Sequence, residues 1–135
     1  GADVIVGFPG ETEDDFIETY NFLNELNISY LHVFTYSERS NTGAVEMGER
    51  VSKETKADRS KMLHILSDKK QRYFHDQFIN KNRPVLFENI KNGKIIGHTD
   101  NYIKVQVEGG TSLINTIQPV MMKENHTSRV SGILD

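Results

Sequence analysis

The chain has 135 residues, of which 36% are hydrophobic and 26% charged, and it contains neither cysteine nor tryptophan. This length allows one ordinary domain or two small ones. No stretch approaches the roughly 18 apolar residues of a membrane-spanning helix, so no membrane partner is expected and the cytoplasm is the default location. Without cysteine, these residues cannot form disulfides, thiolate zinc sites or cysteine-ligated iron–sulfur clusters.

Charge is distributed unevenly between the two halves of the sequence. Residues 1–68 contain 6 Lys and Arg against 13 Asp and Glu, a net charge of −7, whereas residues 69–135 contain 10 against 6, a net charge of +4. The asymmetry indicates two functional units. The second has a net positive charge and could therefore bind a polyanion, although ordinary solvated surface also produces imbalances of this order.

The first 36 residues follow a strand–helix–strand pattern. Asp3–Phe8 is an apolar run with β-branched residues, typical of a strand buried on both faces of a parallel sheet. Thr12 followed by Asp15 predicts a capping box at the start of an amphipathic helix. Tyr30–Tyr36 is rich in aromatic and β-branched residues and predicts the second strand, which completes a right-handed βαβ unit.

Two parallel strands and one helix cannot cover both faces of a sheet. We therefore expect the opening strand to be an interior strand of a larger α/β domain, and the chain to be a fragment of a longer protein. Because open strand edges invite pairing, we also expect the fragment to form a homodimer or to swap elements.

The remaining residues predict one long helix and a small β-barrel. After a polar connection, the helix is expected from Ser52 or Lys53 to about Asn80. Alternating segments separated by turn residues then predict five strands, at Val85–Glu88, Lys94–Thr99, Tyr102–Val107, Ser112–Met121 and Arg129–Leu134. Five short strands in about 50 residues indicate a small antiparallel barrel, since closure removes exposed edges.

Four segments in this order carry a family resemblance: VIVGFPGETEDDF (4–16), LHVFTYSERSNTGA (31–44), VSKETKADR (51–59) and IIGHTDNYIKV (95–105). Together they resemble the C-terminal part of the radical S-adenosylmethionine methylthiotransferases. The segment GHTDNYIKV resembles the branch that acts on threonylcarbamoyladenosine in tRNA (MtaB-type). The similarity extends over nearly the whole chain, to about Leu134.

The resemblance implies a three-part enzyme that uses S-adenosylmethionine and two [4Fe–4S] clusters. Residues 1–52 would be the last βαβ unit of its radical SAM partial barrel, 53–81 a connector helix, and 82–135 a TRAM domain, an OB-like barrel that binds RNA. Both cluster-binding regions would lie upstream of this chain, so none of these cofactors is expected to be bound to the fragment.

The resemblance also places the turn after the first strand beside S-adenosylmethionine. The cofactor-binding candidates in this turn are Gly7, Phe8, Gly10 and Glu11; Val33 and Phe34, at the end of the second strand, could line the same pocket, and Arg39, in the loop beyond it, could bind the amino-acid part of the cofactor or a tRNA phosphate. Glycines allow close approach to a ligand, and a guanidinium suits a carboxylate or phosphate. Each residue has an ordinary structural alternative: a tight strand-to-helix turn for the glycines, a core position for Val33 and Phe34, and a salt bridge for Arg39.

Cations and an aromatic residue recur in the predicted barrel. The RNA-binding candidates are Arg83, Lys94, His98, Asn101, Tyr102 and Lys104. Phosphate neutralisation combined with base stacking is the chemistry that RNA binding requires, and Tyr102 is the best stacking candidate. Taken singly, each lysine is equally explained as solvated surface. The five histidines lack the spacing of a zinc motif, so no metal site is predicted.

The resulting hypothesis is a tRNA-modifying enzyme that adds a methylthio group at C2 of a hypermodified adenosine next to the anticodon. This chain would supply cofactor-pocket wall and tRNA binding, carry no catalytic residue, and be inert alone. The alternatives are a non-catalytic RNA- or protein-binding module and the branch that modifies a ribosomal protein.

Overall fold

The computed structural model describes residues 1–37 and 50–135. These residues form two compact units, Gly1–Lys70 and Gln71–Asp135, and the helix α2 (Lys53–Asp76) contributes to both. No helix in the described ranges is long and apolar enough to cross a membrane.

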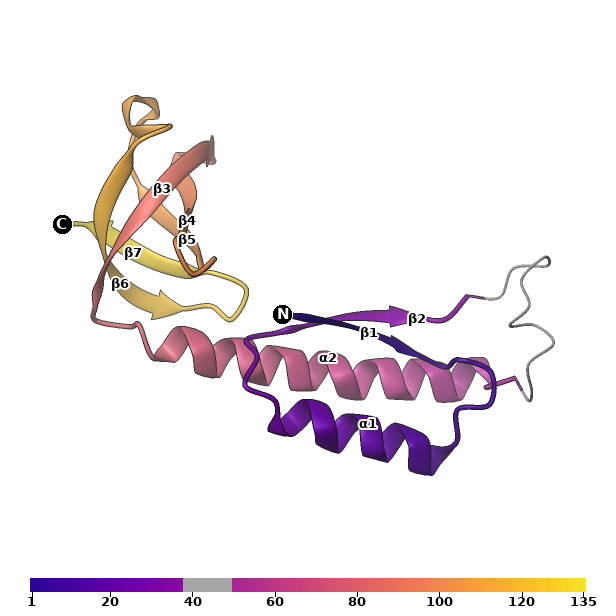
Figure 1. The fold of residues 1–135 in the computed structure, drawn as a ribbon. Coiled ribbons are helices and arrows are strands. Elements are labelled where there is room, and N and C mark those ends of the chain that lie inside the picture. Colours follow the sequence, from indigo (N-terminus) through magenta and orange to yellow (C-terminus); the bar gives the residue numbers. More distant parts are fainter. Residues whose placement is uncertain (38–49) are drawn as a thin grey trace. The chain divides into compact units, whose positions relative to one another are not determined.

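The first unit contains the predicted βαβ arrangement. β1 (Ala2–Val6) and β2 (Leu31–Thr35) pair in parallel, and α1 (Glu13–Glu25) connects them (Figure 1). The capping box is confirmed, since the Thr12 side chain accepts a hydrogen bond from the Asp15 N–H and the Asp15 carboxylate accepts one from the Thr12 N–H, both at 3.1 Å. The sequence therefore fixes the start of α1 through the local hydrogen bonds that a helix N-terminus requires.

One face of this two-stranded sheet is covered by helices and the other is exposed. The buried core comprises Val6, Phe16, Leu23, Leu31, Leu63 and Leu66. On the opposite face Ile5 and Phe34 are 57% and 52% exposed. Among the described residues helices cover only one face, as expected for two strands and two helices, and burial of the other face in a larger domain stays a prediction. The predicted pairing through the strand edges stays a prediction.

The helix α2 is shorter than predicted. It ends at Asp76, not near Asn80, and Asn80 adopts a left-handed backbone with φ of 64°. The chain turns here because it joins the barrel: the Asn80 N–H donates to the Met122 carbonyl at 2.7 Å, and the Met122 N–H donates to the Lys81 carbonyl at 3.0 Å. Tertiary pairing has overridden helix propensity at these residues.

The second unit contains a closed five-stranded barrel. Its strands are β3 (Asn82–Lys91), β4 (Lys94–Thr99), β5 (Lys104–Glu108), β6 (Ile117–Asn125) and β7 (Val130–Leu134), in the spatial order β3-β4-β5-β7-β6. A short 3₁₀ turn, η2 (Thr111–Leu113), occupies the first part of the segment predicted as the fourth strand.

The barrel confirms the predicted fold class but differs from the antiparallel expectation at one pairing. Four of the neighbouring pairs are antiparallel, whereas β5 and β7 pair in parallel. The reason is geometric: strand direction cannot alternate all the way around a ring with an odd number of strands. A closed barrel of five strands must contain at least one parallel pair.

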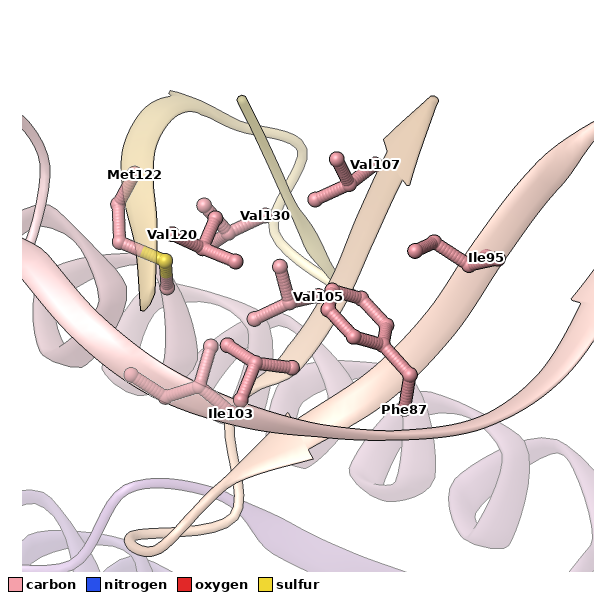
Figure 2. Close-up of a cluster of buried hydrophobic side chains, with 9 residues drawn as sticks. Phe87, Ile95, Ile103, Val105, Val107, Val120, Met122 and Val130 are labelled. Carbon is pink, nitrogen blue, oxygen red and sulfur yellow. The ribbon is translucent and has the colours of Figure 1, made fainter. Parts of the chain in front are cut away.

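A single apolar cluster fills the barrel (Figure 2). It contains Val85, Phe87, Ile95, Ile103, Val105, Val107, Val120, Met122 and Val130, each at most 3% exposed. The alternation of buried and more exposed residues, clearest along β4 and β5, is the pattern from which the barrel was predicted.

Candidate nucleic-acid interface

Three outward-facing side chains lie in a row across neighbouring strands of the barrel. Leu86 of β3 pairs in register with His98 of β4, and His98 pairs with Lys104 of β5. Adjacent strands are about 4.8 Å apart, so the row brings an apolar side chain, an imidazole and an ammonium group together on one face. The His98 Nδ1 lies 2.7 Å from Glu88 Oε1, which orients the ring at the surface.

The loop between β4 and β5 presents Tyr102 beside this row. Tyr102 is 85% exposed and adopts a left-handed backbone with φ of 66°. Hydrogen bonds around Thr99 fix this conformation: the Tyr102 N–H donates to the Thr99 carbonyl and the Ile103 N–H to the Thr99 hydroxyl, both at 3.0 Å. An exposed aromatic ring is thus held on a constrained loop, the arrangement that binding sites often use.

Exposed apolar residues line a cavity of about 570 Å³ next to this tyrosine. Its walls include Pro84, Leu86, Tyr102 and Ile117, with His98 and Asp100 among the polar lining. Leu86 and Ile117 are opposite one another in the β3–β6 pairing and are 44% and 66% exposed. A surface of this kind offers flat apolar contact to an unpaired nucleobase.

Two of the predicted RNA-binding residues hold the loop in place. Arg83 donates to Asp100 at 2.6 Å, and its guanidinium lies 4.9 Å from the centre of the Phe78 ring. Asn101 accepts a hydrogen bond from the Thr99 hydroxyl. Both side chains therefore have intramolecular partners at the base of the Tyr102 loop.

Lys94 lies apart from the other candidates. It is at the opposite end of β4, four residues or about 13 Å from His98, and it pairs with Glu108 across the strands. The structure thus brings together His98, Tyr102 and Lys104 of the six candidates. The sequence interpretation missed Leu86 and Ile117. The alternation of the strands assigns both residues to the outer face of the barrel, and two apolar residues on that face would have indicated them.

The predicted cofactor-binding turn in the first unit is a type II β-turn. The Glu11 N–H donates to the Phe8 carbonyl at 3.0 Å, with Pro9 and Gly10 at the central positions and a φ of 88° at Gly10. This turn type requires a positive φ at its third residue, and Pro-Gly supplies it without strain. The ordinary structural reading of Gly10 therefore has direct support.

Glu11 is engaged by a buried arginine. Its Oε1 accepts from the Gly7 N–H at 3.0 Å and from Arg59 at 2.6 Å, and Arg59 also donates to the Glu11 carbonyl at 3.1 Å. The Arg59 side chain is 7% exposed and its guanidinium lies 5.5 Å from the Phe16 ring centre. The sequence interpretation did not single out Arg59, which is forty-eight residues from Glu11.

The remaining candidates of the first unit lie on different faces of the sheet. Phe34 is on the helix-free face, and Phe8 is 42% exposed with its ring 5.2 Å from that of Tyr36. Val33 is half-buried against the helix-covered core. Arg39 lies outside the described residues.

Phe8, just after β1, and Phe34, near the end of β2, expose apolar surface of the kind that the adenine of S-adenosylmethionine would contact. The chain does not fit an iron–sulfur cluster: it has no cysteine, and the described residues contain no group of three potential metal ligands. Cluster ligands would have to come from outside these 135 residues.

The second unit is a small OB-like barrel that exposes an aromatic ring and cations on one face. OB-like barrels commonly bind oligonucleotides and oligosaccharides.

No family model matches the chain. Its curated relatives include two proteins named threonylcarbamoyladenosine tRNA methylthiotransferase MtaB, from Bacillus subtilis (40% identity over 88% of this chain and 28% of the relative) and Aquifex aeolicus (39%, over 81% and 26%). A tRNA-2-methylthio-N(6)-dimethylallyladenosine synthase from Protochlamydia amoebophila is 37% identical over 89% of this chain and 27% of its own length.

The chain belongs to the methylthiotransferase family of these relatives, as its sequence motifs predicted. It spans between a quarter and a third of the length of the curated relatives that it matches.

Proposed function

We propose that the intact protein is a radical S-adenosylmethionine enzyme that adds a methylthio group at C2 of a hypermodified adenosine next to the anticodon of tRNA. The observation that carries this proposal is 32–40% identity, over most of this chain, to tRNA methylthiotransferases of two kinds. The exposed Tyr102, beside His98 and Lys104, supports it independently, because a protein that modifies tRNA has to bind RNA.

Within this enzyme the barrel, residues 82–135, would bind the tRNA. Tyr102 would stack on an unpaired base, with Leu86 and Ile117 as the adjoining apolar surface. Lys104, and His98 when protonated, would contact phosphates, a sequence-independent and salt-dependent contribution. Arg83 and Asn101 would act indirectly by holding the Tyr102 loop.

Residues 1–52 would form part of the cofactor-binding barrel, and residues 53–81 would connect the two parts. Phe8 and Phe34 would contribute apolar wall to the S-adenosylmethionine pocket, while Glu11 would hold the turn through Gly7 and Arg59. The radical and sulfur-transfer chemistry would be supplied by S-adenosylmethionine and two [4Fe–4S] clusters. Because this chain has no cysteine to hold a cluster, it would be catalytically inert alone.

Among the possible nucleosides we propose threonylcarbamoyladenosine. The segment from Gly97 to Val105 has the sequence typical of that branch, and the relatives from B. subtilis and A. aeolicus carry that substrate in their names. The protein would work in the cytoplasm, where its tRNA substrate is found.

The test is mass spectrometry of tRNA nucleosides from a strain that lacks the gene. We expect the 2-methylthio derivative of threonylcarbamoyladenosine to disappear while threonylcarbamoyladenosine itself accumulates, and the intact gene to restore the derivative. Loss of the methylthio group from dimethylallyladenosine instead would reassign the substrate. Unchanged methylthio nucleosides in tRNA would remove the proposed function, and a change in a ribosomal protein would then indicate the other branch.

A further inference from the structure

A second surface outside the barrel gathers positive charge. It is a groove of about 930 Å³ in the first unit, between the end of β2 and the first turns of α2. Its lining includes Thr35 and Tyr36 of the strand side and four basic side chains of the helix, Lys53, Lys56, Lys61 and His64.

The charge of this groove is opposite to that of its surroundings. Residues 1–68 contain only six Lys and Arg, and three of them line the groove. The same residues contain thirteen Asp and Glu, yet no acidic side chain from the described part of the unit is among the lining. Such segregation within a segment of net charge −7 is the electrostatic pattern of an anion-binding surface.

The basic side chains form a stripe along one side of α2. Lys53, Ser60 and His64 are seven and four residues apart, the spacing of one helix face, and Lys61 lies beside them. From Lys53 to His64 the stripe is about 16 Å long, enough for several phosphates of a nucleic-acid strand but far longer than one carboxylate.

The cations of the groove are available to a ligand. Among the described residues Lys53 and Lys61 form no ion pair, and both are exposed. Lys56 is held at the groove by its bond to the Tyr36 carbonyl at 3.3 Å. His64 Nδ1 lies 2.8 Å from the Ser60 carbonyl, which can only accept, so this nitrogen donates and Nε2 is left for a ligand, to which it donates when the ring is charged.

We propose that this groove binds the phosphodiester backbone of RNA, as a second contact in addition to the barrel. The proposal rests on the proposed function, because tRNA is the polyanion which that function supplies. The lining favours phosphates over a protein surface, since it combines three lysines with hydroxyl groups and, among the described residues, contains no leucine, isoleucine, valine, methionine or phenylalanine side chain.

The experiment measures tRNA binding by the intact protein and its dependence on salt. The test variant is Lys53→Gln with Lys61→Gln. The matched control is Lys69→Gln, an exposed lysine of the same helix that faces about 160° away from Lys53 and does not line the groove. A Lys53→Arg, Lys61→Arg variant retains the charge, and thermal unfolding verifies that every variant is folded.

Removing two phosphate contacts should reduce the slope of log K against log salt by about 1.4–1.8 and weaken binding roughly 25- to 60-fold at 0.1 M salt. The control and the arginine variant should bind like the wild-type protein. If tRNA binds but the double glutamine variant retains the wild-type slope, the groove proposal is overturned while the proposed function stands. If the wild-type protein does not bind tRNA at all, both are overturned.

Discussion

The two units of this chain solve the problem of strand edges in opposite ways. The barrel closes on itself through the β5–β7 and β3–β6 pairings, so every strand has two neighbours. The sheet of the first unit has two strands, and each has one partner among the described residues. Closure therefore makes the barrel complete in itself, whereas the first unit leaves backbone edges and an apolar face accessible.

The interactions that stabilise the two units also differ. The barrel depends on a continuous apolar core, whereas the first unit has a smaller apolar core and, in addition, hydrogen bonds from polar side chains to the backbone. Ser67 accepts from the Leu31 N–H at 2.8 Å and donates to the Leu31 carbonyl at 3.0 Å, which satisfies both groups at the start of β2. Lys70 donates to the Leu26 carbonyl at 2.8 Å, just after the end of α1. The comparison predicts that apolar truncation harms the barrel most and polar truncation the first unit.

The largest effect is expected for Phe87→Ala. Phe87 is fully buried in the barrel core, so the substitution removes a large side chain and leaves a cavity, at a cost of about 3–5 kcal/mol. A domain of about 65 residues has only roughly 3–10 kcal/mol of stability, so much of the barrel should unfold. Urea denaturation followed by circular dichroism measures the loss.

Leu86→Ala is the matched control for this prediction. Leu86 is the neighbouring residue on the same strand but faces outward and is 44% exposed. Its truncation should change stability by less than about 1 kcal/mol. Equal losses for the two variants would contradict the inside–outside assignment of β3.

The second prediction concerns the polar clamp of the first unit. Glu11→Ala removes the carboxylate that pairs most closely with the buried Arg59 guanidinium and accepts from the Gly7 N–H, and we expect a loss of about 3 kcal/mol. Glu13→Ala removes the other carboxylate near Arg59, but this one is 69% exposed and 3.4 Å away, so less than about 1 kcal/mol should be lost. If Glu13→Ala proved as harmful as Glu11→Ala, burial would not be what strengthens the Glu11 pair.

Local patterns predicted most of the fold. The Thr12–Asp15 capping box and the alternation in the barrel strands follow from residue spacing alone, and the structure confirms both. The end of α2 and the position of β6 could not be predicted in the same way, because they depend on bonds between Asn80, Lys81 and Met122, segments that are about forty residues apart. Non-local pairing decides these boundaries, and sequence spacing carries little information about it.

The candidate sites also differ in whether they depend on local or on non-local contacts. Tyr102, His98 and Lys104 could be grouped from sequence because His98 and Lys104 lie on adjacent strands and Tyr102 lies in the short loop that joins them. Arg59 was missed because its partner Glu11 is distant in the sequence, and a single arginine within a charged helix looks like ordinary surface. Exposed residues that cooperate locally are predictable, whereas a buried ion pair between distant segments requires the structure.

The third prediction is a pH dependence of the barrel unit. Burial lowers the pKa of His75 below the usual 6.5, against the opposing influence of Asn125, Asp76 and the Thr127 backbone. The folded state therefore prefers neutral His75, and its contribution to stability is fully present above pH 6.5 and is lost as the pH falls below that value. The urea midpoint should decrease from pH 7.5 to pH 5.

Substituting the histidine separates its contribution from those of other groups. In His75→Gln the decrease of the urea midpoint between pH 7.5 and pH 5 should become smaller, whatever the variant's stability at pH 7.5. In His32→Gln, which alters an exposed side chain outside the barrel unit, the unfolding transition of the barrel unit should keep the pH dependence of the wild type. An unchanged pH dependence in His75→Gln would mean that His75 protonates equally well in the folded and unfolded states.

The smallest effect on stability is expected for Tyr102→Gly, which should weaken tRNA binding while hardly changing the free energy of unfolding. Tyr102 has a left-handed backbone that is unfavourable for a residue with a Cβ and natural for glycine, while its exposed ring contributes little packing. We therefore expect a change in unfolding free energy of no more than about 1 kcal/mol, in the stabilising direction relative to Tyr102→Ala. Both variants should lose the binding energy of one stacked base, about 1–3 kcal/mol in tRNA affinity. If a variant without this ring retained its tRNA affinity, the left-handed loop would serve the barrel fold and not RNA binding. The RNA-binding surface would then have to lie on another part of the barrel.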